Sequence, residues 1–281
     1  MRGPEILLLA ALALTACDRQ PEGKPVLRTE IGSGKALPVG GKASGAAASA
    51  SPTPAAIPGD PCTRSEFEGV AITDCIADPA KHVILAALGQ PPYRGYAKLK
   101  AAMGDEAAKV AFAVNAGMFD GEGKPIGYFV RNGDRRQELN RADGSGNFHM
   151  KPNGVFYGAK GKWHVRTSAD FYSNVTDRPD FGTQSGPMLV IAGKLHPEFS
   201  EDGPSRNIRN GVGVDAQGRA HFAISEGPIS FGSFARYFRD VAKTPDALYL
   251  DGNVSSLWDP VAKRMDARAP IGPMLVVERK D

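Results

Sequence analysis

Polar and glycine-containing segments that could carry chemistry recur where the chain leaves or enters predicted strands, which is where functional loops tend to lie. None of them identifies an enzyme alone, because the chain lacks Gly-x-Ser-x-Gly, Gly-x-x-x-x-Gly-Lys and His-Glu-x-x-His patterns. Taken singly, each is typical of a turn or a surface charge. The segments span residues 114–120, 184–190, 205–215, 226–233 and 250–256.

Short strands are the main elements that would position these segments. Apolar runs between turn residues predict them at 112–115, 126–130, 154–157, 162–165, 187–191, 212–214, 220–224, 248–250 and 273–277. Apolar spacing of three and four predicts only two helices, at 96–108 and 233–241. We therefore expect an α+β fold: a mixed, largely antiparallel sheet with few helices, in a single domain at 60–281.

The succession of segments resembles the phosphodiester glycosidase family over about residues 110–278. Residues 115–119, Asn-Ala-Gly-Met-Phe, are similar to the Asn-Gly-Gly-Tyr-Phe in which a family strand ends. Residues 208–213 match a family segment Pro-Arg-Thr-Ala-Ile-Gly, so Arg209 takes the place of the family Arg, although the Pro and Thr are absent. Asn115 and Gly117 become candidate substrate-binding residues by this resemblance.

Two carboxylates also fall on family positions. Glu226 stands where the family has Asp-Gly before a helix, and Asp251 lies in a segment similar to Leu-Asp-Gly-Gly-Gly-Ser-Ser. Asn253 and Val254 replace the second and third glycines of that segment. These departures indicate a divergent branch of the family.

The resemblance implies cleavage of the bond between a sugar anomeric carbon and a phosphate. Glycoside cleavage usually needs two carboxylates, and Asp251 and Glu226 are the candidates, with their individual roles left open. Arg209, with Arg206 as a possible helper, can hold an anionic phosphate through its planar guanidinium. We expect Arg209, Glu226, Asp251 and Asn115 to converge in one polar cleft.

Further groups could bind the same substrate. The backbone N–H groups of Gly232 and Ser233, at the start of a predicted helix, offer an anion site. The hydroxyls of Ser255 and Ser256 could bond sugar or phosphate oxygens, although such a pair after a turn is as often a cap or a brace for the loop.

The resulting hypothesis is a hydrolase that acts on a sugar phosphodiester in the bacterial envelope. The alternative is a non-catalytic module that binds phosphorylated glycans, and the replaced glycines after Asp251 favour it. A weaker alternative is an envelope scaffold whose loops contact another protein.

Composition excludes several other classes. The net charge is only +3 and basic residues are interspersed with acidic ones, so we expect no nucleic-acid partner. The five histidines are dispersed without zinc-ligand spacing, and we expect neither a metal nor a cofactor. A minor alternative is an oxygen-ligand site for Ca²⁺ or Mg²⁺ formed by Asp120, Asp215 and Asp251.

The N-terminus carries a predicted export signal. Residues 6–14 form an apolar run of signal-peptide length, too short to span a bilayer as a helix. The run ends in Leu-Thr-Ala-Cys17, which resembles a bacterial lipobox, so we expect residues 1–17 to be a lipoprotein signal and Cys17 to carry a lipid. An ordinary secretory signal with an incidental cysteine is the alternative, which Glu5 favours.

Residues 18–59 are rich in Ala, Gly, Pro and Ser and have few large apolar residues, which predicts a disordered tether. The domain would then face the periplasm, anchored to the membrane. Because export places Cys62 and Cys75 in an oxidising compartment, we expect them to form a disulfide, with two free thiols as the alternative.

Overall fold

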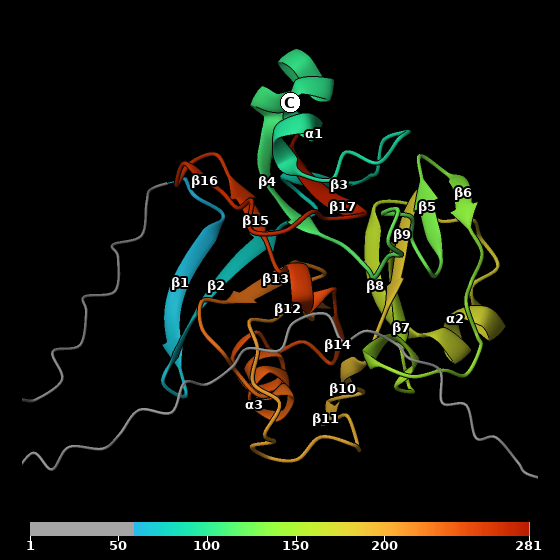
Figure 1. Ribbon diagram of the computed structural model, residues 1–281, viewed down its shortest axis with the longest axis vertical. Coiled ribbons are helices and arrows are strands. Elements are labelled where there is room, and N and C mark those ends of the chain that lie inside the picture. Colours follow the sequence, from blue (N-terminus) through green and yellow to red (C-terminus); the bar gives the residue numbers. More distant parts are fainter. Residues whose placement is uncertain (1–58, 281) are drawn as a thin grey trace, which may run out of the picture. The chain divides into compact units, whose positions relative to one another are not determined.

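The computed structural model describes residues 59–280, so the predictions for the signal, for Cys17 and for nearly all of the tether lie outside the described residues. The described chain forms three sheets in which every paired strand is antiparallel (Figure 1). This architecture confirms the predicted α+β fold with its largely antiparallel strands and few helices.

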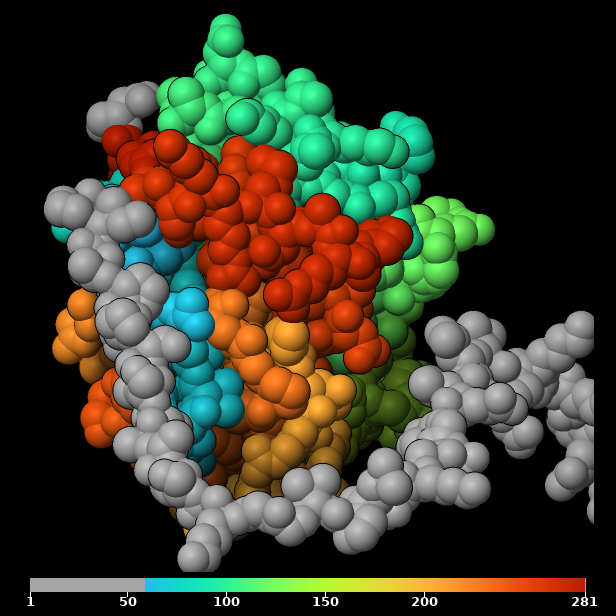
Figure 2. Space-filling view, turned by 60° about the vertical axis from the view of Figure 1, so that its left-hand side comes forward, coloured from blue at the N-terminus to red at the C-terminus, as the bar shows by residue number. Residues whose placement is uncertain are grey.

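The largest sheet has seven strands and contains the first hairpin. In spatial order its strands are β1 (Cys62–Phe67), β2 (Val70–Ala77), β13 (Ala220–Ser225), β12 (Asn210–Val214), β14 (Asp246–Tyr249), β10 (Met188–Ile191) and β11 (Lys194–Leu195). On the face shown in Figure 2, the blue first hairpin lies beside orange and red segments from the last third of the chain.

Two five-stranded sheets complete the fold. The second contains β16 (Arg264–Met265), β15 (Leu257–Asp259), β4 (Val110–Asn115), β17 (Met274–Arg279) and β3 (His82–Ala87) in that order. The third contains β6 (Asp134–Gln137), β5 (Phe129–Arg131), β9 (Phe181–Ser185), β7 (Gly154–Ala159) and β8 (Lys162–Thr167).

Three buried phenylalanines join the three sheets in one core. Phe222 of β13 meets Phe112 of β4 and Phe156 of β7, with ring centroids 5.5 Å and 5.6 Å apart and edge-to-face geometry. All three side chains are at most 1% exposed. Edge-to-face pairs add about 0.5–1.5 kcal/mol each beyond the burial of their area, so this contact fixes the sheets around the strand ends.

Both predicted helices exist with different bounds. The run predicted at 96–108 forms α1 (Tyr96–Met103), which ends at Gly104 with φ of 58°, and a 3-10 turn (Gly104–Lys109). The second helix, α3 (Phe231–Arg236), begins two residues earlier than predicted and continues as a π turn (Tyr237–Val241).

The expectation of only two helices was wrong, because α2 (Ser168–Asn174) forms between β8 and β9. Its N-cap, Thr167, accepts a hydrogen bond from the Asp170 backbone N–H at 3.1 Å. Within residues 59–280 no helix has the length and apolarity needed to cross a bilayer.

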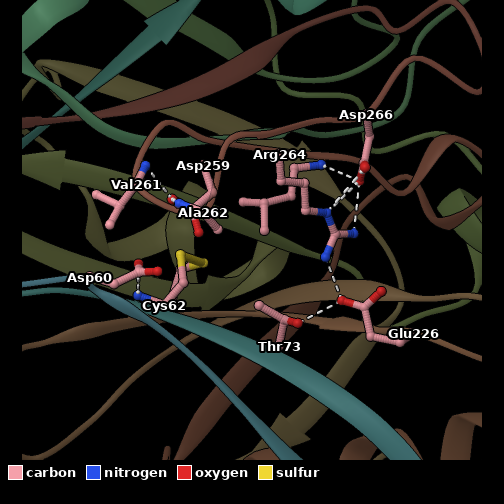
Figure 3. Close-up of a disulfide and its surroundings, with 11 residues drawn as sticks. Asp60, Cys62, Thr73, Glu226, Asp259, Val261, Ala262, Arg264 and Asp266 are labelled. Atoms are coloured by element: carbon pink, nitrogen blue, oxygen red, sulfur yellow. Dashed lines mark hydrogen bonds and ion pairs between the residues drawn. A yellow bond between two sulfur atoms is a disulfide. The ribbon is translucent and has the colours of Figure 1, made fainter. Parts of the chain in front are cut away.

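The predicted disulfide between Cys62 and Cys75 is confirmed. The two cysteines lie directly opposite each other in the β1–β2 pairing, which brings their sulfurs within bonding distance. Figure 3 shows the bridge beside β15 and the segment that contains Arg264.

Candidate active site

Asn115 lies at the centre of the candidate site, at the last position of β4. Its side chain is 1% exposed, and its Nδ2 donates to the backbone carbonyl of Asp251 at 2.8 Å. Its Oδ1 accepts from Asn210 Nδ2 and from the Ser256 backbone N–H, each at 2.9 Å. One amide therefore joins the end of β4, the start of β12 and both sides of the loop after β14.

Backbone hydrogen bonds hold the same loop at its entry. The Leu250 N–H donates to Asn210 O at 3.0 Å, and the Asp251 N–H donates to Ala116 O at 3.1 Å. Ala116 follows β4 of the second sheet, and Asn210 is the first residue of β12 in the first sheet. Two different sheets therefore set the position of Asp251.

Gly117 is required by close packing. Its N–H donates to Thr183 Oγ1 at 3.0 Å, and a Cβ atom placed on it would lie only 2.0 Å from the Gln184 carbonyl oxygen. A larger residue at 117 would therefore push the loop away from β9. The structure thus gives Gly117 a structural role, and its contact with substrate stays a prediction.

Ser255 and Ser256 are buried and brace the loop. Ser255 Oγ donates to Gly252 O at 2.9 Å and approaches Asn210 Oδ1 at 3.2 Å. Ser256 Oγ lies 3.2 Å from the Tyr96 hydroxyl. These contacts agree with the bracing role that the sequence left open, whereas a contact of either hydroxyl with substrate stays a prediction.

The Asp251 carboxyl group is partly buried, and burial raises its pKa to about 6. The backbone N–H of Asn253 acts in the opposite direction by favouring the carboxylate, but less strongly. The group therefore exists in both protonation states near pH 6, as catalytic carboxyl groups often do.

Tyr249, the last residue of β14, connects this loop to Arg209. Its hydroxyl accepts from Arg209 Nη1 at 3.3 Å and from the Gly252 backbone N–H. A Cβ at position 252 would lie 1.7 Å from that hydroxyl oxygen, so only glycine fits beside it. Contact with Tyr249, rather than a positive φ, therefore requires glycine at position 252.

Arg209 is held by protein oxygens in the described conformation. Its side chain is 1% exposed, with Nε donating to Ile229 O at 2.8 Å and Nη2 donating to Ser205 O at 2.7 Å. The guanidinium also stacks on Phe231, 3.5 Å from the ring centroid. No carboxylate within residues 59–280 pairs with it. A bidentate grip on phosphate would require the exposed Ser205 segment to move.

Arg206 and Ser233, two of the other predicted anion-binding residues, have partners of their own. Arg206 is exposed and donates to both carboxylate oxygens of Asp202 at 2.5 and 2.6 Å. The Ser233 N–H donates to its N-cap Ser230, and the Ser233 hydroxyl donates to Glu68. Gly232 packs closely against the Ser200 carbonyl. Their binding of substrate stays a prediction.

Glu226 follows β13 and lies in an ion pair. Its Oε1 accepts from Thr73 Oγ1 at 2.6 Å and from Arg264 Nη1 at 2.5 Å, and Arg264 also contacts Asp266 (Figure 3). Its Oε2 has no hydrogen-bond partner in the described part of the chain. No hydrogen bond or ion pair between the described residues joins Glu226 to Asp251.

The structure thus brings Asn115 and Asp251 into direct contact and links Arg209 to the Asp251 loop through Tyr249. Sequence reasoning missed Asn210 and Tyr249 as site residues, although Asn210 lies within the segment 205–215 and Tyr249 directly precedes the segment 250–256. It also missed Arg264, for which the sequence offers no signal, because that arginine reaches Glu226 across two sheets.

The alternative oxygen-ligand site is not formed. Asp120 accepts N–H groups of its own turn, and Asp215 pairs with Arg219 and His221. Among residues 59–280, the one group with metal-ligand proximity is Asp60, Cys62 and Asp259. The sulfur of Cys62 is in the disulfide, so this group lacks a third ligand.

Comparison with known proteins identifies related chains. A family model described as phosphodiester glycosidase matches residues 108–278. The uncharacterized protein YigE of Escherichia coli K12 is 36% identical over 172 residues, covering 61% of this chain and 67% of YigE.

Two solved structures are similar in fold. The zebrafish N-acetylglucosamine-1-phosphodiester alpha-N-acetylglucosaminidase catalytic domain, auto-inhibited by its pro-peptide, has a TM-score of 0.51 at 14% identity, covering 78% of this chain and 82% of that one. A hypothetical protein from Synechocystis has a TM-score of 0.50 at 14% identity, over 78% of this chain and 61% of that one. At these identities the likeness concerns the fold.

Proposed function

Since the chain belongs to the phosphodiester glycosidase family, we propose that its domain is a hydrolase that cleaves the bond between a sugar anomeric carbon and phosphate. The observation that carries this proposal is the placement of Asp251. Its carboxyl group is partly buried, its pKa is raised to about 6, and its loop is fixed by Asn115 from a second sheet. A reactive carboxyl group needs such a fixed position.

Asp251 can serve this reaction in its carboxylate form. A carboxylate can attack the anomeric carbon or remove a proton from an attacking water molecule. A phosphate leaving group is already stable as an anion, so the reaction needs less help from a general acid than ordinary glycoside cleavage does. The ion pair of Glu226 with Arg264 is therefore compatible with a mechanism that depends mainly on Asp251.

The proposed substrate is a sugar phosphodiester or a phosphorylated glycan of the bacterial envelope. This location rests on the signal-like N-terminus and on Cys17, through which the chain would be anchored with the domain facing the periplasm. The disulfide between Cys62 and Cys75 is consistent with an exported protein.

A second candidate is a non-catalytic module that binds phosphorylated glycans. Asn253 and Val254, which replace family glycines beside Asp251, favour it. Both the hydrolase and the module should bind a phosphorylated glycan, but only the hydrolase should cleave it.

The test is an assay of the purified chain against a panel of sugar phosphodiesters, with release of the free sugar as the measurement. We expect turnover of at least one member and its loss in Asp251→Asn, which keeps the side-chain shape and removes the charge. Asp105→Asn, at an exposed position, is the matched control and should retain full turnover. Binding without turnover by the unaltered chain would support the module instead.

A further inference from the structure

A groove lies on the third sheet, beside α2, and none of its lining residues belongs to the candidate active site. It has a volume of about 370 Å³ and is bordered by α2, by the segment after β6 and by the segment before β9. Figure 1 shows α2 beside the strands of the third sheet. We call it the α2 groove. The lining residues that bear on its binding properties are Tyr128, Leu139, Arg141, Phe171, Tyr172 and Arg178.

The floor of the α2 groove is aromatic and fixed. Tyr128 and Phe171 are each 6% exposed and pack together with ring centroids 4.8 Å apart. Leu139 and Val175 pack on the same small cluster. The Tyr128 hydroxyl has no hydrogen-bond partner among residues 59–280, which leaves a polar group available at the base of the groove.

Tyr172 presents its ring to solvent at the edge. At 61% exposure it is the most exposed large hydrophobic side chain in the described part of the chain. The Arg141 guanidinium stacks over it, 3.8 Å from the ring centroid, and this contact favours one orientation of the largely uncovered ring. An exposed aromatic ring of this kind is typical of a recognition surface.

The rim of the groove carries unpaired positive charge. Glu138 pairs with Arg135 and Asp177 pairs with Lys160, so both acidic side chains are neutralised. Within residues 59–280, neither Arg141 nor Arg178 has a carboxylate partner. Two guanidinium groups therefore remain at the rim to attract an anionic ligand.

We propose that the α2 groove is a second binding site that takes an anionic glycan, in which sugar rings carry phosphate groups. The apolar face of a sugar ring would pack on Tyr172, a sugar hydroxyl would reach Tyr128, and Arg141 and Arg178 would contact the anion. The site would hold a long glycan away from Asp251 and contribute affinity without chemistry.

An acidic peptide is a less suitable occupant. Its exposed tyrosine suits the flat face of a sugar ring. A peptide that bound through charge alone would require the arginines and would not need the Tyr172 ring.

The test measures binding of phosphomannan to the full chain, with the same mannan after removal of phosphate as the neutral probe. The Asp251→Asn background prevents the proposed hydrolysis from consuming the probe, so this result does not depend on the proposed function. Tyr172→Ala and Arg141→Gln should each weaken binding about tenfold, by loss of stacking and of charge. Arg239→Gln, an exposed arginine outside the groove, is the matched control and should bind as tightly as its parent.

Three outcomes would overturn the proposal. The first is equal binding by the groove variants and their parent, and the second is equal affinity for mannan with and without phosphate. The third is tighter binding of poly-glutamate than of phosphomannan, lost in Arg141→Gln but retained in Tyr172→Ala, which would assign the groove to an acidic peptide. With Asp251 restored, Tyr172→Ala should turn over a small sugar phosphodiester as fast as the unaltered chain does, because the groove lies outside the candidate active site.

Discussion

The side-chain amide of Asn115 lies 2.8 Å from the backbone carbonyl of Asp251, and this contact joins two sheets at the candidate site. Oδ1 of the same side chain accepts hydrogen bonds from Asn210 Nδ2 and from the Ser256 backbone N–H. Asn115 therefore binds the loop at Asp251 and at Ser256, and it also binds the start of β12. Such a loop can keep a partly buried carboxyl group in place despite the cost of burying its charge.

We predict that Asp251→Asn stabilises the fold at neutral pH. The folded-state pKa of Asp251, about 6, lies above its usual value of 3.8, so the folded chain binds this proton more tightly than the unfolded chain does. The free energy of unfolding therefore decreases as pH rises from about 4 to 6. Asparagine removes the buried charge, and the variant should be more stable at pH 7 by roughly 1–3 kcal/mol.

Urea unfolding at pH 4 and at pH 7 measures this difference. The difference should be small at pH 4, where the folded-state carboxyl group is protonated and the unfolded-state group is partly protonated. A gap of the same size at both pH values would show that Asp251 does not titrate near 6.

Local sequence patterns predicted much of the fold. The turns at Asn132-Gly133 and Gly158–Gly161 predicted two hairpins, because each turn constrains strands that are neighbours along the chain. Missed strands such as β1, β2 and β9 contain polar residues like Arg64, Thr73 and Gln184, which break the apolar runs on which the prediction depended.

The candidate site was harder to predict because its contacts are not local. Asn115 and Asp251 were both singled out, but their hydrogen bond spans 136 positions. The burial of Arg209 depends on Ile229 and Phe231, which approach it only in the folded chain. The sequence therefore indicated which residues lie near the candidate site. It could not indicate which of their polar atoms already bind other protein groups.

We predict that membrane attachment depends on Cys17. The lipobox-like sequence before it implies lipidation, and attachment through acyl chains stabilises membrane binding by about 0.8 kcal/mol per buried methylene. Cys17→Ser should move the protein from the membrane fraction to the soluble fraction, as followed by immunoblotting of fractionated cells. Cys62→Ser is the control, and it should fractionate like the parent. An unchanged distribution of Cys17→Ser would place the anchor elsewhere.

We predict that titration of His221 makes the free energy of unfolding depend on pH above about 6, the pKa of Asp251. His221 Nδ1 lies 2.8 Å from Asp74 Oδ2, and its Nε2 lies 3.3 Å from Asp215 Oδ2. Burial acts to lower the pKa of His221, but the two carboxylates together raise it above 6.5. The protonated histidine therefore stabilises the fold fully below pH 6.5, and this contribution is lost as pH rises through the folded-state pKa.

The measurement is the difference in unfolding free energy between the parent and His221→Gln across pH 5.5 to 8.5. Burial lowers the pKa values of His82, His164 and His196, which act in the opposite sense, so only the difference isolates His221. The gap should be largest at low pH and should narrow as pH rises. A constant gap would mean that His221 contributes no titration in this range.

We predict that Arg209→Lys destabilises the fold by about 2–4 kcal/mol, because lysine cannot reproduce three separate hydrogen bonds and the stacking on Phe231. Arg206→Lys is the matched control three residues earlier. Arg206 is exposed and bound only to Asp202, so its variant should stay within about 0.5 kcal/mol of the parent.

Steady-state kinetics of Arg209→Lys and Arg206→Lys distinguish two roles for Arg209. It either positions Asp251 through Tyr249 or binds the phosphate of the substrate. Arg209 donates to the Tyr249 hydroxyl, which also accepts from the N–H of Gly252, the residue after Asp251. If Arg209 positions Asp251 through these contacts, Arg209→Lys should lower kcat with little change in KM. Tyr249→Phe removes the shared hydroxyl and should lower kcat in the same way. A raised KM with unchanged kcat in Arg209→Lys would instead show that the guanidinium leaves its protein partners to bind phosphate. Equal stability of Arg209→Lys and Arg206→Lys would contradict the buried network itself.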